Sequence, residues 1–77
     1  MAKYTADFDY EGTAPTSSFM ENLVKEEAGY SNSKKISIVR WEITTSDSKS
    51  NVKSNLATTI KNHGKYTNGK LTSVSVS

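Results

Sequence analysis

The side chains of this sequence that could act in catalysis are few and far apart. His63 is the single histidine, and it stands where the chain pattern predicts the end of a helix. A histidine acting as a general base needs an orienting partner and a substrate pocket, yet the nearest carboxylates in sequence are Asp47 and Glu42. We therefore interpret His63 as a helix-terminal residue that favours the negative end of the helix dipole, not as a catalytic base.

Three carboxylates alternate along one predicted strand. Asp7, Asp9 and Glu11 share one side of that strand, with neighbours about 7 Å apart. Two of them would have the residue types of an acid/base pair, and all three have the oxygens that a divalent cation prefers. A cation site needs ligands that converge from several directions, however, and these lie along one line. We predict that these carboxylates form a solvated strand face without a metal. If this face has a function, we expect an acidic strip that, together with Tyr10, contacts a basic partner.

The remaining signatures of enzymes are absent. The chain has no cysteine, so it offers neither disulfides nor thiolate zinc ligands. Its four glycines form no phosphate-binding pattern, and none of its serines stands in a nucleophile elbow. We predict a protein with no catalytic residue, no cofactor and no metal.

The apolar residues are periodic, which predicts five elements in a chain of 77 residues. Alternation over residues 3–11 and the β-branched and aromatic residues of 35–45 predict strands. The first helix has the capping-box spacing of Ser18 and Glu21. For the second, Ser46, Asp47 and Ser48 are suitable N-caps, and Gly64 is a suitable C-terminal stop. The predicted order is a strand over 3–11, a helix over 16–28, a strand over 35–45, a helix between 50 and 64, and a strand over 71–76.

These elements predict a fold of the α/β (or α+β) class, as a single two-layer domain over residues 1–77. The expected sheet has three strands, with both helices on one face as crossovers between parallel strands. Residues 35–45 are apolar on both sides, which favours the central position. A rival arrangement pairs residues 65–67 with the last strand as an antiparallel hairpin around Asn68–Gly69.

A sheet covered by helices on one side leaves its other face open. Ile36 and Ile38 share one parity of the predicted strand 35–45, whereas Val39, Trp41 and Ile43 share the other. If Val39, Trp41 and Ile43 face the helices, Ile36 and Ile38 are uncovered, or the reverse; in either arrangement we expect an apolar patch on the open face near Trp41 that supports dimerisation or partner binding.

Charge is distributed unevenly along the chain. Residues 1–33 hold two lysines against six carboxylates, for a net charge of −4, whereas residues 34–77 hold eight basic residues against two carboxylates, for +6. Basic and aromatic side chains together are typical of surfaces that bind single-stranded nucleic acid. The residues of this alternative function are Arg40, Lys49, Lys53, Lys61, Lys65, Tyr66 and Lys70.

The predicted function is a small non-enzymatic protein-interaction module. In its small size, its many lysines, serines and asparagines and its lack of cysteine, the chain resembles accessory proteins of bacteriophages and other mobile elements, many of which are stoichiometric inhibitors of host proteins. The resemblance implies an inhibitor or adaptor that works through charged surfaces. No signal peptide or membrane-length apolar run appears, so we expect a cytoplasmic protein. The expected contact residues are Asp7, Asp9, Tyr10, Glu11 and Trp41.

Overall fold

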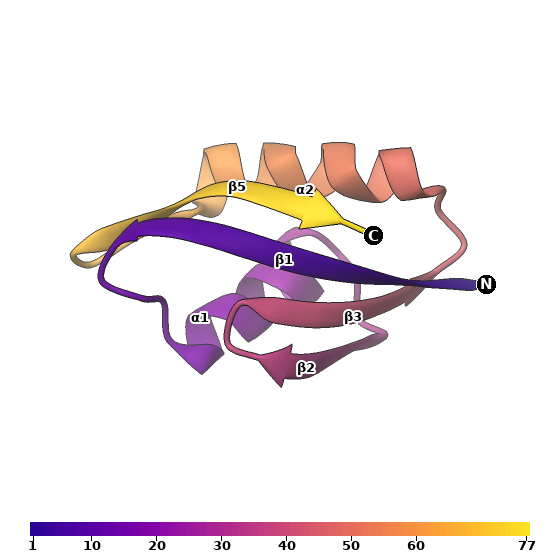
Figure 1. Ribbon diagram of the computed structural model, residues 1–77, viewed down its shortest axis with the longest axis horizontal. Coiled ribbons are helices and arrows are strands. Elements are labelled where there is room, and N and C mark those ends of the chain that lie inside the picture. The colour runs from indigo at the N-terminus through magenta and orange to yellow at the C-terminus, as the bar shows by residue number, and fades with distance from the viewer.

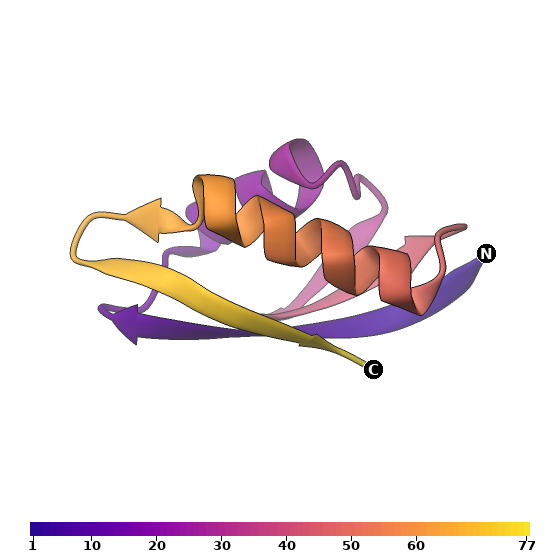
Figure 2. The same cartoon turned by 90° about the horizontal axis from the view of Figure 1, so that it is seen from above.

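The longest strand, β1, lies at the centre of a five-stranded sheet whose one face is covered by both helical segments (Figures 1 and 2). The computed structural model describes residues 1–77. Its elements are β1 (Ala2–Gly12), α1 (Ser17–Glu21), the π-helical segment η1 (Asn22–Glu27), β2 (Ser33–Ser37), β3 (Arg40–Thr45), α2 (Lys49–His63), β4 (Lys65–Tyr66) and β5 (Gly69–Val76).

The strand order is β2-β3-β1-β5-β4, and every neighbouring pair is antiparallel. The domain is therefore α+β, and the expectation of three strands with parallel neighbours is wrong. The first helical connection joins β1 to β2, which run parallel with β3 between them, and α2 leads through the short strand β4 to β5, which runs parallel to β3 with β1 between them. Two such split β-α-β units give the connectivity of ferredoxin-like domains. That connectivity hosts many unrelated functions, so it indicates none by itself.

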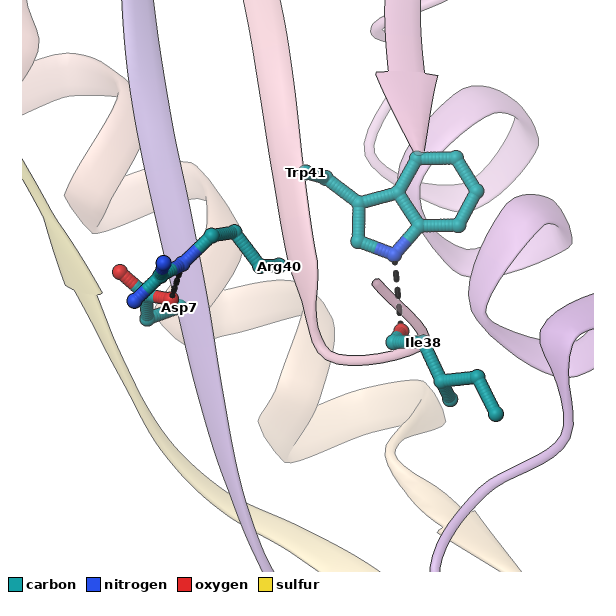
Figure 3. A network of polar contacts seen from close by, with 4 residues as sticks. All are labelled: Asp7, Ile38, Arg40 and Trp41. Atoms are coloured by element: carbon teal, nitrogen blue, oxygen red, sulfur yellow. Dashed lines mark hydrogen bonds and ion pairs between the residues drawn. The ribbon is translucent and has the colours of Figure 1, made fainter. Parts of the chain in front are cut away.

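The predicted strand 35–45 is a hairpin, because the chain turns at Ile38 and Val39 between β2 and β3. Its apolar residues occupy both faces because they belong to two strands, not because one strand is central. Ile36 and Ile38 remain 53% and 39% exposed. The Trp41 indole N–H donates to the carbonyl oxygen of Ile38 at 2.9 Å and so ties β3 to the turn (Figure 3).

The rival hairpin at the C-terminal end is confirmed. β4 and β5 pair antiparallel around Asn68, whose φ of 66° is the left-handed conformation that such tight turns require. The register between β1 and β5 shifts next to Asp9 and Tyr10, which leaves Thr72 as an extra, exposed residue. Because of this bulge, Leu71 and Val74 both face the helices.

Helix caps explain where the two helices begin. The Thr16 hydroxyl oxygen accepts from the Phe19 backbone N–H at 3.1 Å, so Thr16 rather than Ser18 caps the first helix. The Ser48 hydroxyl oxygen accepts from the Asn51 N–H at 3.2 Å, as one of the predicted caps of α2. Ser48 therefore places the start of α2 within two residues of the predicted boundary.

The hydrophobic core lies between the sheet and the helices. Trp41 is the largest fully buried side chain, and it faces Ala6 across the β1–β3 pairing, where a small residue leaves room for the indole. None of the helices is long and apolar enough to cross a membrane. The core residues are Ala6, Phe8, Met20, Leu23, Val24, Tyr30, Trp41, Ile43, Val52, Leu56, Ile60, Leu71 and Val74.

Candidate binding surfaces

Of the two apolar sets of residues 35–45, Trp41 and Ile43 face the helices, and Ile36 and Ile38 are the ones left exposed. Trp41 is 1% exposed and points toward the helices (Figure 3). Its neighbours along β3, Arg40 and Glu42, occupy the open face because side chains alternate along a strand. Trp41 is therefore a core residue, and the exposed apolar side chains next to it are Ile36 and Ile38.

The acidic strip lies on the open face, but two of its carboxylates already have partners. Arg40 Nε donates to Asp7 Oδ1 at 2.6 Å (Figure 3), and Ser73 Oγ donates to Asp9 Oδ2 at 2.8 Å. Tyr10 belongs to the opposite side of β1, where its cross-strand neighbour is the buried Leu71. The face that carries the strip is therefore mixed in charge and partly neutralised within the chain.

The other charged surface is rich in lysine, and its one carboxylate is Glu11, which lies opposite Lys70 in the β1–β5 pairing. Lys49, Lys53 and Lys61 follow one ridge of α2 at intervals of four or eight residues, so the same side of the helix carries all three. The chain contains no aspartate or glutamate after Asp47. We call this surface the basic side; its five exposed lysines are Lys49, Lys53, Lys61, Lys65 and Lys70.

The two remaining residues of the predicted nucleic-acid surface are Arg40 and Tyr66, and they differ in where they lie. Arg40 is on the open sheet face with Asp7. The Tyr66 ring packs against Phe19, with 4.8 Å between ring centroids, and its hydroxyl donates to the Thr13 carbonyl oxygen at 2.7 Å. Tyr66 still lines a hollow together with Lys65 and Lys70, so the basic side lacks its expected arginine, and its one aromatic side chain is held by Phe19 and Thr13.

A groove of about 520 Å³ opens where the last turns of α2 approach β5. Ala57, Ile60 and Leu71 contribute apolar surface to it. Its charged residues are Lys61, Lys65 and Lys70, with Glu11 as the single carboxylate. The groove is thus an apolar-floored extension of the basic side with an excess of positive charge.

One pairing was not predicted from the sequence. His63 Nε2 lies 3.2 Å from Glu27 Oε2, although 35 residues separate them along the chain. No local signal announces this contact, because it depends on the packing of η1 against α2. Both side chains are partly exposed and neither lines the groove beside β5. No group of three or more histidine, aspartate or glutamate side chains is placed to hold a metal ion.

Comparison with protein-family models, with curated proteins and with solved structures finds no match to this chain.

Proposed function

We propose that this chain is a non-enzymatic protein-binding module that acts as an inhibitor or adaptor by docking its basic side on an acidic surface of a partner. The observation that carries the proposal is the run from Lys49 to Ser77, which holds five lysines and no carboxylate. The charges of the basic side are not neutralised by neighbours in sequence. On the open sheet face, in contrast, Arg40 and Asp7 satisfy each other.

The size of the molecule also favours a surface function. A standard protein interface takes about 800 Å² from each partner, and the chain exposes 4574 Å² in all. One face of the molecule is therefore large enough for a stable contact.

The proposal is tested by affinity capture from the native host with two charge-reversal pairs. Lys53→Glu with Lys61→Glu changes the basic side, whereas Asp7→Lys with Asp9→Lys changes the acidic strip. All four positions lie at the surface or partly exposed, so both double variants should keep the far-UV circular dichroism of the wild type. We expect the lysine variant to lose the partner and the aspartate variant to retain it.

The reverse result would place the contact on the acidic strip and overturn the choice of surface. A wild-type chain that captures no protein would overturn the function itself. If the aspartate variant unfolds, the strip has a structural role in the sheet, and the assignment of its carboxylates as dispensable surface groups is wrong.

Nucleic-acid binding is the second candidate, because the same five lysines suit a phosphate backbone. Repeating the capture after nuclease treatment separates the two functions. A partner lost on nuclease treatment, with affinity that falls steeply as salt rises, favours nucleic acid. Retention after nuclease favours a protein.

A further inference from the structure

The two edges of the sheet differ in how they are protected. One edge of the sheet is formed by β2, which carries Lys34 and Lys35 and has a register irregularity before Ser37. Lysines and bulges are the usual means by which an edge strand avoids pairing with another chain. At the other edge, β4 pairs with only the first residues of β5, Gly69 and Lys70. The stretch after Thr72 is uncharged and free of proline.

The free hydrogen-bonding groups of β5 follow from its register with β1. Thr5 and Ser77 exchange both backbone hydrogen bonds, at 2.9 and 3.0 Å. Such bonded pairs recur at every second residue of an antiparallel ladder, so Ser75 and Ser73 also bond toward β1. The N–H and C=O groups of Val74 and Val76 therefore point away from β1, along the uncovered edge. Figure 2 looks onto this edge, with α2 beside it.

Positive charge borders the same edge. Lys61, Lys65 and Lys70 line the groove where the uncovered part of β5 begins. Lys53 lies two turns earlier on the ridge of α2 that Ala57 and Lys61 share, and it continues the charge along β5. An added strand would thus run beside a row of lysines.

We infer that an extended acidic segment of a partner protein adds to the sheet along β5, bonds to Val74 and Val76, and sets its carboxylates beside Lys61 and Lys65. The inference rests on the proposed function and specifies how the basic side engages its partner. Main-chain bonds supply affinity in strand addition, while the flanking side chains select the sequence.

A second copy of this chain is the less suitable occupant. Pairing β5 with β5 of another molecule would bring two sets of the same lysines to one junction, and the resulting repulsion opposes the contact. An acidic segment meets the same lysines with attraction.

The probe is a ten-residue peptide of alternating glutamate and valine, added to the isotope-labelled full chain. We expect slowed hydrogen exchange at the Val74 and Val76 amides, with little change at Ser73 and Ser75, whose amides already bond to β1. A peptide with lysine in place of glutamate should give no protection. Absence of protection by the glutamate peptide, or protection confined to another element, overturns the inference, as does concentration-dependent protection without peptide, which indicates self-pairing.

A backbone variant tests the hydrogen bonds themselves. Val76→Pro removes an outward N–H, which a sheet edge tolerates, and Val76→Ala is the matched control that loses side chain but keeps the donor. We expect the proline variant to bind the peptide about three- to tenfold more weakly than the alanine variant, as the loss of one hydrogen bond implies. Equal affinities contradict strand addition.

The two proposals fail in different ways. If the wild-type chain captures no partner from its host, the proposed function fails. If capture depends on Lys53 and Lys61 but is as strong for Val76→Pro as for Val76→Ala, the basic side binds its partner without strand addition, and only the present inference falls.

Discussion

At the scale of single residues, polar atoms of two large aromatic side chains secure the attachment of loops to the core. The Trp41 indole N–H bonds to the turn at Ile38, as a buried tryptophan requires. Tyr30 is buried, and its hydroxyl donates to Asp47 Oδ2 at 3.1 Å, across the loop before α2. Such contacts fix where the connections between elements lie.

The Tyr30 hydroxyl should make stability sensitive to alkaline pH. Burial, reinforced by Asp47, raises its pKa above the usual value of 10.0. The folded state therefore holds this proton more tightly than the unfolded state. The contribution of the protonated hydroxyl to stability is complete below pH 10 and is lost as the pH rises toward the pKa of the folded state.

Tyr30→Phe has no hydroxyl to titrate. We expect its free energy of unfolding, measured by urea titration, to be about 1 kcal/mol lower than the wild type at neutral pH. Between about pH 9 and pH 11 it should decline less steeply than that of the wild type. Parallel pH curves for the two proteins would contradict the assignment.

At the scale of elements, the ends of strands depend on backbone conformations that few residues adopt. Gly12 ends β1 at a φ of 83°, and a Cβ there would collide with the carbonyl oxygen of Asn68. Gly29 has nearly the same φ, 82°, but open space around it. The two glycines thus separate backbone strain from steric collision.

Gly12→Ala should be the more damaging of two matched substitutions. We expect Gly29→Ala to lower the free energy of unfolding by about 1 kcal/mol, from the positive φ alone. Gly12→Ala should cost about 3 kcal/mol, because it adds displacement of the β4–β5 turn. Thermal melts followed by circular dichroism measure both, and equal losses would show that the turn yields freely.

At the scale of the whole molecule, the first strand and the last strand are neighbours in the middle of the sheet. β1 pairs with β3 on one side and with β5 on the other (Figure 1). The last strand therefore contributes both core residues and main-chain bonds to the central strand. The sheet and the core are complete only when β5 pairs with β1.

Removal of residues 74–77 should therefore abolish cooperative unfolding. It deletes the buried Val74 and the half-buried Val76. Complete burial of one such side chain contributes about 1.5–3 kcal/mol to stability. The truncation also leaves residues 5–8 of β1 without a neighbouring strand on that side. A domain of this size has roughly 4–12 kcal/mol of stability in all. Removal of Met1, which is 90% exposed, is the control. A sharp thermal transition in the C-terminal truncation would show that β5 is dispensable.

Much of the local structure was predictable from particular residues. The alternation from Lys3 to Glu11 located β1, Ser48 and Gly64 bounded α2, and Asn68–Gly69 indicated the last hairpin. The hairpin at Ile38 and Val39 was not, because it contains no glycine, asparagine or proline and neither residue has a positive φ. Because Ile and Val are also the residues that favour strands, this turn cannot be distinguished from a continuous strand by its sequence.

The sequence by itself determined which side chains are buried in most elements and that its last thirty residues carry lysines without carboxylates. Periodicity reports burial, since each element must turn one side to the core. Only the tertiary structure decided which strands are neighbours, that Trp41 faces the helices, and that Arg40 pairs with Asp7 on the open face of the sheet. Those outcomes depend on contacts between distant segments, whose free energy no local pattern records.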